Sequence, residues 1–179
     1  MKPTNVKTLV AGALGAVLLL TVAGTAAAET LDSQERFSAA RVDRITVDDR
    51  RVSWGIIIRN DIDTTISLFR ADGNDITVSL SGEVESNRKR CLPALEARER
   101  GGSLQVAVST CSGPTAFLSM SGRMDLEIGV PAGWRGDYRV NASSADVTAD
   151  AVELAEAELD VSSGSIQISE LDAEEQIPE

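Results

Sequence analysis

The chain has 179 residues and a formal net charge of −11, from 28 Asp and Glu side chains against 17 Lys and Arg. An acidic protein of this kind repels phosphate backbones, so we expect no nucleic acid among its partners. The sequence has no histidine, which removes the commonest general base, the Ser-His and Cys-His nucleophile pairs and most zinc sites. We therefore expect a protein that is not an enzyme and has no catalytic residues.

The first 28 residues have the order of a secretory signal peptide. Lys2 and Lys7 come before an uncharged apolar run over residues 9–23, and small residues lead up to Ala28. Signal peptidase recognises this succession of positive, apolar and small segments. We expect cleavage after Ala28 and export to the periplasm or the extracellular space. The alternative is an uncleaved N-terminal anchor, because residues 8–28 are uncharged and roughly long enough to span a bilayer.

The remainder, residues 29–179, has a length that suits one domain. We divide it into a β-rich domain over residues 29–171 and an acidic C-terminal tail over residues 172–179. No second long apolar run follows the signal peptide, so we expect no transmembrane segment once the peptide is removed. Basic residues end at Arg139, whereas acidic ones continue to Glu179.

Short stretches in which apolar and polar residues alternate predict strands along most of the domain. Such alternation, interrupted by Asp-Gly and Asn-Asp pairs, is typical of half-buried strands joined by tight turns. In chain order we predict strands over residues 45–47, 52–58, 65–69, 76–82, 104–108 and 124–130, a turn over residues 71–75, and two strand–corner–strand units over residues 138–149 and 159–168.

Residues 86–100 break this pattern, because they combine Pro93 with several charges and show no alternation. We predict a loop there, or a short helix over residues 92–97. The simplest interpretation of its charges is a solvated surface. The alternative is a patch that contacts an anionic partner, such as an envelope polymer or the acidic face of another copy. The candidate interaction residues are Arg88, Lys89, Arg90, Arg98 and Arg100.

The two C-terminal units repeat with a spacing of 19 residues, at which Ser143 matches Ser162, Val140 matches Leu159 and Val147 matches Ile166. A unit of this length, with two short strands around a small polar corner, suits one coil of a β-solenoid, in which each coil buries its apolar stripe against the next. We predict an all-β, single-domain, solenoid-like stack of short strands with one charged loop insertion. An ordinary antiparallel meander is the alternative.

Three motifs carry a resemblance to a known family. Residues 126–133 read Leu-Glu-Ile-Gly-Val-Pro-Ala-Gly, residues 143–147 read Ser-Ser-Ala-Asp-Val, and residues 162–166 read Ser-Ser-Gly-Ser-Ile. In this order they resemble the bacterial putative adhesin family, a domain of unknown function built as a β-solenoid. Ala145 stands where the family usually has Gly. The resemblance implies a solenoid fold and a role in surface or envelope contact, with an unidentified envelope polymer or protein as partner.

Calcium is the one small ligand that the residues suggest, although we expect no cofactor. Asp72, Asn74 and Asp75 place several oxygen ligands within one turn, and hard cations prefer oxygen ligands. The alternative function is a calcium- or cation-stabilised extracytoplasmic binding module with the acidic C-terminal coils as its site. A plain turn is the simpler interpretation, because Asp, Gly and Asn are also the usual turn formers. We interpret Trp54 as a core residue and Trp134 as packing over a corner, since tryptophan is usually buried.

Cys91 and Cys111 both fall in the exported part of the chain. An even cysteine count in an oxidising compartment predicts one disulfide. Closing a loop of about 20 residues stabilises a fold by about 3 kcal/mol in the chain-entropy model. We expect both thiols of the exported protein to resist alkylation until a reductant is added, and unfolding to become easier by that amount in the double Cys→Ser variant. Ready alkylation of both thiols without reductant would contradict the bridge.

Overall fold

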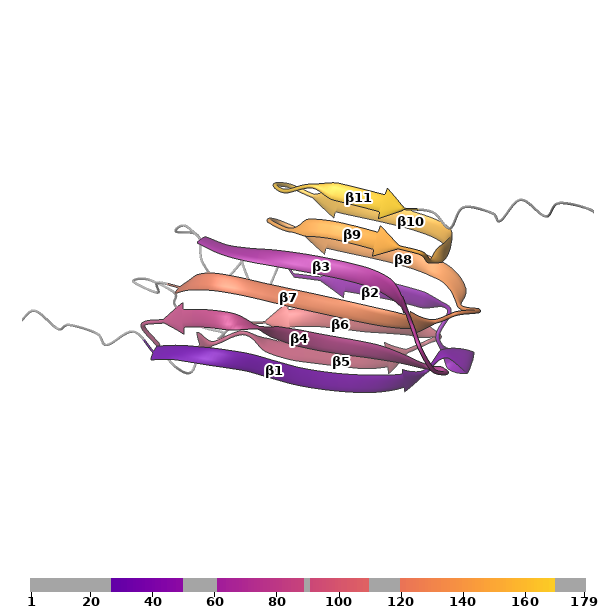
Figure 1. Ribbon diagram of the computed structural model, residues 1–179, viewed down its shortest axis with the longest axis horizontal. Helices are drawn as coiled ribbons and strands as arrows, with labels where there is room; N and C mark the ends of the chain where they lie inside the picture. The colour runs from indigo at the N-terminus through magenta and orange to yellow at the C-terminus, as the bar shows by residue number, and fades with distance from the viewer. Residues whose placement is uncertain (1–26, 50–60, 89–90, 110–119, 170–179) are drawn as a thin grey trace, which may run out of the picture.

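The computed structural model describes residues 27–49, 61–88, 91–109 and 120–169 (Figure 1). Within these ranges the chain forms strands and one short 3-10 helix, and no helix there is long and apolar enough to cross a membrane. The elements are β1 (Ala27–Ser38), η1 (Ala39–Arg41), β2 (Arg44–Asp48), β3 (Asp61–Ala71), β4 (Asp75–Ser86), β5 (Ala94–Arg100), β6 (Ser103–Ser109), β7 (Met120–Pro131), β8 (Arg135–Ala142), β9 (Asp146–Asp150), β10 (Glu153–Val161) and β11 (Ile166–Ser169).

The strands form two sheets that lie one behind the other in Figure 1. Sheet A has the order β1-β4-β7-β3-β9-β11, and sheet B has the order β10-β8-β2-β6-β5. Alternate residues of each strand point to opposite faces, and the inward ones are apolar. Ile45 and Val47 of sheet B and Ile66, Leu68 and Ile128 of sheet A are all fully buried. The core is therefore the space between the two sheets.

Four pairs of consecutive strands form coils, namely β2–β3, β6–β7, β8–β9 and β10–β11. The first strand of each coil lies in sheet B and the second in sheet A, and corresponding strands of neighbouring coils pair in parallel. Leu159 pairs with Val140, and Ile166 pairs with Val147. The predicted 19-residue repeat is thus the register of the last two coils, and the β-solenoid-like fold is confirmed.

The coils are not stacked in the order of the sequence. The β2–β3 coil lies between the β6–β7 and β8–β9 coils, so the chain passes over one coil between β7 and β8. At the opposite end from β10 and β11, strands β1 and β4 extend sheet A and β5 extends sheet B, all by antiparallel pairing. The molecule is therefore a parallel stack with an antiparallel end.

The predicted charged loop over residues 86–100 is wrong for its second half, which is the edge strand β5. Gly101 and Gly102 both have positive φ, 59° and 75°, which suits a tight hairpin from β5 into β6. Leu95 and Ala97 pack against the core, while Glu96, Arg98, Glu99 and Arg100 are charged. Charges are common on edge strands because they discourage unwanted pairing, and here they conceal the alternation from sequence reasoning.

Strand β1 was also not predicted. Only Leu31 and Phe37 of this strand pack against the core, so its sequence carries almost no apolar alternation. It is ordered by pairing with β4 along its whole length, from Ala27 opposite Ser86 to Ser38 opposite Asp75. The predicted strand over residues 52–58, the tail over residues 172–179 and the signal peptide up to residue 26 lie outside the described residues.

Strands β4 and β7 approach each other closely at two glycines. Gly82 and Gly122 have φ of 143° and 141°, a region that side chains disfavour. A Cβ on Gly82 would overlap the carbonyl oxygen of Arg123, and a Cβ on Gly122 would overlap that of Glu83. Each glycine therefore admits the backbone of the opposite strand.

We expect Gly82→Ala to lower the free energy of unfolding by at least about 1–3 kcal/mol, because it combines a strained φ with a backbone overlap. Gly133→Ala is the matched control, since a Cβ there meets nothing within 4 Å. Chemical denaturation of both variants measures the difference. Equal stability of the two would show that β4 and β7 tolerate a wider separation.

Candidate functional site

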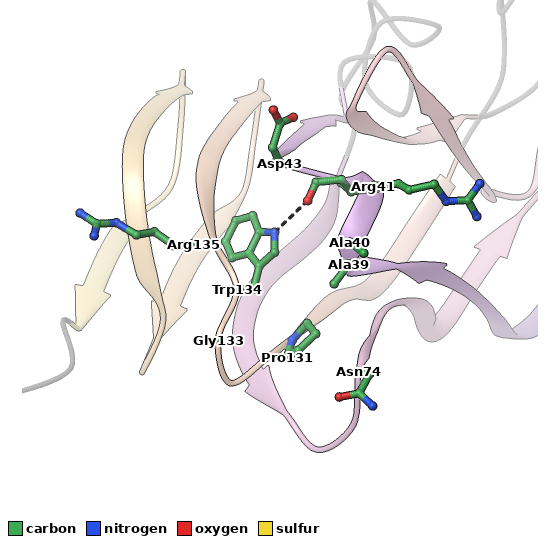
Figure 2. A pocket seen from close by; sticks show the side chains of 10 residues that line it. Ala39, Ala40, Arg41, Asp43, Asn74, Pro131, Gly133, Trp134 and Arg135 are labelled. Carbon is green, nitrogen blue, oxygen red and sulfur yellow. Dashed lines mark hydrogen bonds between the residues drawn. The ribbon is translucent and has the colours of Figure 1, made fainter.

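A shallow hollow of about 570 Å³ lies where η1, the β3–β4 turn and the β7–β8 turn meet (Figure 2). Trp134 forms its wall, and its indole N–H donates a hydrogen bond of 3.2 Å to the carbonyl of Val42. The side chain is only 8% exposed, so the ring offers no open face to a sugar. This confirms the interpretation of Trp134 as packing over a corner. Trp54 lies outside the described residues.

The polar side chains around this hollow do not converge. Arg41 and Arg135 point away from each other in Figure 2, and Asn74 lies apart on its own turn. A site for catalysis or tight ligand binding needs several polar groups aimed at one point. On its other side Trp134 packs closely on Gly136, where a Cβ would lie 2.6 Å from the indole ring.

The candidate calcium ligands lie in the turn that joins β3 to β4. Asp72, Asn74 and Asp75 are all exposed there, and Gly73 has φ of 114°. The predicted turn is confirmed. In the part of the chain that the structure describes, no three His, Cys, Asp or Glu side chains are grouped to hold a metal ion. The geometry therefore gives no support to the calcium module.

Two of the predicted interaction residues lie on β5, the edge strand of sheet B. Arg98 and Arg100 are exposed on β5 and lie opposite Gln105 and Ser103 of β6. Both point away from the core, because their neighbours Ala97 and Glu99 pair with the buried residues Val106 and Leu104. We call Arg98 and Arg100 the basic row. Arg98 also borders a shallow depression of about 340 Å³ together with Asp48 and Glu96.

Of the rest of the predicted patch, only Arg88 lies within the described residues. Arg88 precedes β5 and lies in the connection from β4, where the hydroxyl of Ser86 binds its N–H and its carbonyl at 3.1 Å. Lys89 and Arg90 lie outside the described residues. Cys91 is fully buried just before β5, whereas Cys111 lies outside the described residues. The disulfide therefore stays a prediction.

Sequence reasoning missed a row of acidic residues on β10, at the opposite edge of sheet B. Their neighbours Ala157, Leu159 and Val161 pair with the buried residues of β8, so the intervening side chains point outward. We call Glu156, Glu158 and Asp160 the acidic row. Arg139 of β8 reaches across to this row, with its Nε 2.6 Å from a carboxylate oxygen of Glu158. The signal was present as alternation in β10, but only the strand order reveals its place at an edge.

Carboxylates cap the corners of the coils. A carboxylate oxygen of Asp49, a residue only 2% exposed, accepts a hydrogen bond of 3.2 Å from the N–H of Ser143. One corner further, Asp146 accepts hydrogen bonds from the N–H and the hydroxyl of Ser165, at 2.9 and 2.7 Å. The two hydrogen bonds from Ser165, first that of the hydroxyl, lower the pKa of Asp146. These acidic residues therefore hold corners together.

The corner at Gly164 has the close approach that its sequence predicted. The N–H of Ala145 donates to the carbonyl of Ser163 at 2.9 Å, and a Cβ on Gly164 would overlap the backbone of Ala145. A glycine is therefore needed in the upper corner. Ala145 itself is 3% exposed, so its methyl group fits the preceding corner.

The Toastrack DUF4097 family model matches residues 55–176, more than half of the chain. The chain belongs to this family. The match confirms the resemblance seen in the three motifs and extends it toward the N-terminus. The Toastrack match begins after β2, although β2 pairs with both β6 and β8 in the middle of sheet B. The folded unit is therefore longer than the matched segment.

Solved structures with a similar fold include a putative cell adhesion protein from Clostridium sporogenes, at 8% identity and a TM-score of 0.43, covering 77% of this chain and 59% of that one. Two putative adhesins, from Parabacteroides distasonis and Parabacteroides merdae, match at 15% and 10% identity, each with a TM-score of 0.30, covering 78% and 77% of this chain and 56% of each of theirs. The Toastrack chain thus spans less than two thirds of these proteins. At such scores the likeness carries no argument about its role. No curated protein matches the chain.

We expect Asp146→Ala to lower the melting temperature near pH 7 and to have a smaller effect at about pH 3. A folded-state pKa below the ordinary carboxyl value means that the contribution is present above that value and is lost as the pH falls through the folded pKa. Thermal unfolding at both pH values tests this, with Asp150→Ala, at the exposed end of β9, as the control. An effect of equal size at both pH values would refute the role of the carboxylate.

Proposed function

We propose that this Toastrack domain is exported and works without catalysis, by surface contact in the cell envelope or just outside it. Export is supported by the order of positive, apolar and small segments over residues 1–28. A contact role is supported by the architecture, because a two-sheet stack presents flat outer faces and open edges. The lack of histidine throughout the sequence favours contact over acid–base chemistry.

The observation that carries this proposal is the basic row. Arg98 and Arg100 are two residues apart on the same face of a strand, so they lie about 7 Å from each other along β5. Guanidinium groups bind carboxylates and phosphates through paired hydrogen bonds. Two arginines in a row therefore suit an anionic partner whose charged groups repeat along a polymer or along the edge of a sheet.

The charge of the remaining surface confines this contact to one place. A chain with a net charge of −11 repels an anionic partner nearly everywhere else. Attraction at the β5 edge combined with repulsion elsewhere orients the partner along that edge. Because the arginines are exposed, the attraction weakens as the salt concentration rises.

We expect the double variant Arg98→Glu, Arg100→Glu to lose about tenfold in association with the envelope fraction, since two attractive pairs become repulsive. Fractionation of the source cells, followed by quantification of the protein in each fraction, gives the measurement. The control variant Arg70→Glu, Arg123→Glu changes the net charge equally but places the changes on β3 and β7, in the interior of sheet A. Undiminished envelope association of the β5 variant would overturn the proposal.

A further inference from the structure

The two ends of the stack differ in charge and in the strands that they present. One end consists of β10 and β11, and the other consists of β5 and β1, as Figure 1 shows. Within the described residues each of these four strands has a neighbour on one side only. The outer face of β10 carries the acidic row, whereas the outer face of β5 carries the basic row. The same sheet thus ends in opposite charges.

The β10–β11 end also exposes inward-facing apolar side chains. Ile166 and Ile168 of β11 are 47% and 42% exposed, although they pair with the buried residues Val147 and Ala149 of β9. They point toward the core space but have a coil on only one side. A further strand pair stacked on this end would cover them, in the way that β10–β11 covers the coil below.

We propose that the anionic partner of the basic row is the acidic row of a second copy, so that copies of this chain associate head to tail. This inference rests on the proposed function and names its partner. Each contact would join β10 of one copy to β5 of the next and would extend both sheets across the junction. Such a contact uses a different surface on each copy, so every added copy presents a new free end. Because both sheets continue along the axis of the stack, repeated addition produces linear oligomers.

The directions of the strands allow both sheets to continue. Strand β5 is antiparallel to β6, which runs parallel to β2, β8 and β10, so β10 meets β5 of the next copy in an antiparallel pair. Strand β1 is antiparallel to β4, and β4 is antiparallel to β7, so β1 and β7 run in the same direction. Strands β3, β9 and β11 all run parallel to β7. β11 therefore meets β1 in a parallel pair. Both arrangements are ordinary ladders.

One register satisfies charge and apolar burial together. Placing Glu158 opposite Arg98 also places Glu156 opposite Arg100, which gives two opposite-charge pairs across the junction. On the inner face the same register aligns Leu159 with Ala97 and Val161 with Leu95. All four of these inner side chains are partly buried and pack against the core of their own copy. Asp160 then faces Glu96, a single like-charge pair.

Contact between two β10 edges is disfavoured by the same charges, because it would bring two acidic rows together. The charge pattern therefore selects the head-to-tail contact over the symmetric β10 dimer. It also predicts that low salt strengthens assembly, because exposed charge pairs are screened as the ionic strength rises.

The test uses two charge-reversed variants of the protein purified after export. The first carries Arg98→Glu and Arg100→Glu, and the second carries Glu156→Arg and Glu158→Arg, so that each variant reverses one side of both opposite-charge pairs. The second variant also breaks the ion pair between Arg139 and Glu158, but both side chains are exposed, so little stability is lost. Sedimentation velocity at low salt follows assembly across a range of concentrations. We expect the unaltered protein to form concentration-dependent oligomers, and each variant alone to need at least about tenfold more protein to do so.

An equimolar mixture of the two variants gives the decisive measurement. Each variant has like charges at both ends, but the ends of one are complementary to those of the other, so the mixture regains assembly. Recovery in the mixture also shows that both variants are folded. The variant Arg70→Glu, Arg123→Glu is the control and assembles as the unaltered protein does.

A monomeric unaltered protein at all concentrations, or variants that assemble alone as readily as it does, would overturn the head-to-tail contact. If the unaltered protein is monomeric while the Arg98, Arg100 variant still loses envelope association, the partner is an anionic envelope polymer. In that case the proposed function stands and the self-association is wrong. If that variant keeps its envelope association, the proposed function fails whatever the purified protein does.

Discussion

The burial of apolar side chains between neighbouring coils is the interaction on which this protein depends. Val147 and Ala149 in the β8–β9 coil are each 1% exposed, because coils lie on both sides of them. Ile166 and Ile168 occupy the same positions in the last coil, and nearly half of each side chain is exposed. A single coil therefore cannot bury its own stripe, as in other repeat structures. The apolar surface accumulates at the end of the stack, away from its broad faces.

Stacking in parallel register also determines what the corners can contain. Where the chain turns between sheets B and A, the backbone leaves the ladder and its N–H groups need other partners. Asp49 supplies one for Ser143, which is distant in sequence, and Asp146 supplies one for Ser165 of the next repeat. Part of the negative charge of the chain thus has a structural role. The charges on the outer faces of the edge strands remain available for contact.

The sequence predicted those parts of the fold in which periodicity and burial coincide. The alternation in β2, β4, β6 and β7 and the 19-residue repeat of the last two coils all correspond to inward-facing stripes. Strands β1 and β5 were missed because an edge strand buries few residues. Most of its side chains face solvent, so its sequence shows little alternation of apolar and polar residues. The glycine pair at Gly101 and Gly102 was the one local signal of the β5–β6 hairpin.

The candidate site was also predicted only in part from the sequence. The arginines were found as a run of charges, but sequence spacing cannot show that a strand aligns Arg98 with Arg100 and leaves Arg88 before its start. The acidic row has the alternation of any half-exposed strand, and its meaning comes from the strand order of sheet B. That order depends on contacts between residues far apart in sequence. Arg44 and Asp137, for example, form an ion pair of 2.7 Å across β2 and β8.

The order of the coils has a consequence for how the chain acquires its structure. The β2–β3 coil is the first to be synthesised, but it becomes the middle of the stack and packs on coils that end at Pro131 and Asp150. No stable core can form until most of the domain has been made, and contacts between such distant segments form slowly. The nascent chain therefore stays unfolded after its N-terminus has been synthesised and can be bound by other proteins. In the export that we propose, late folding would keep the chain extended for passage across the membrane.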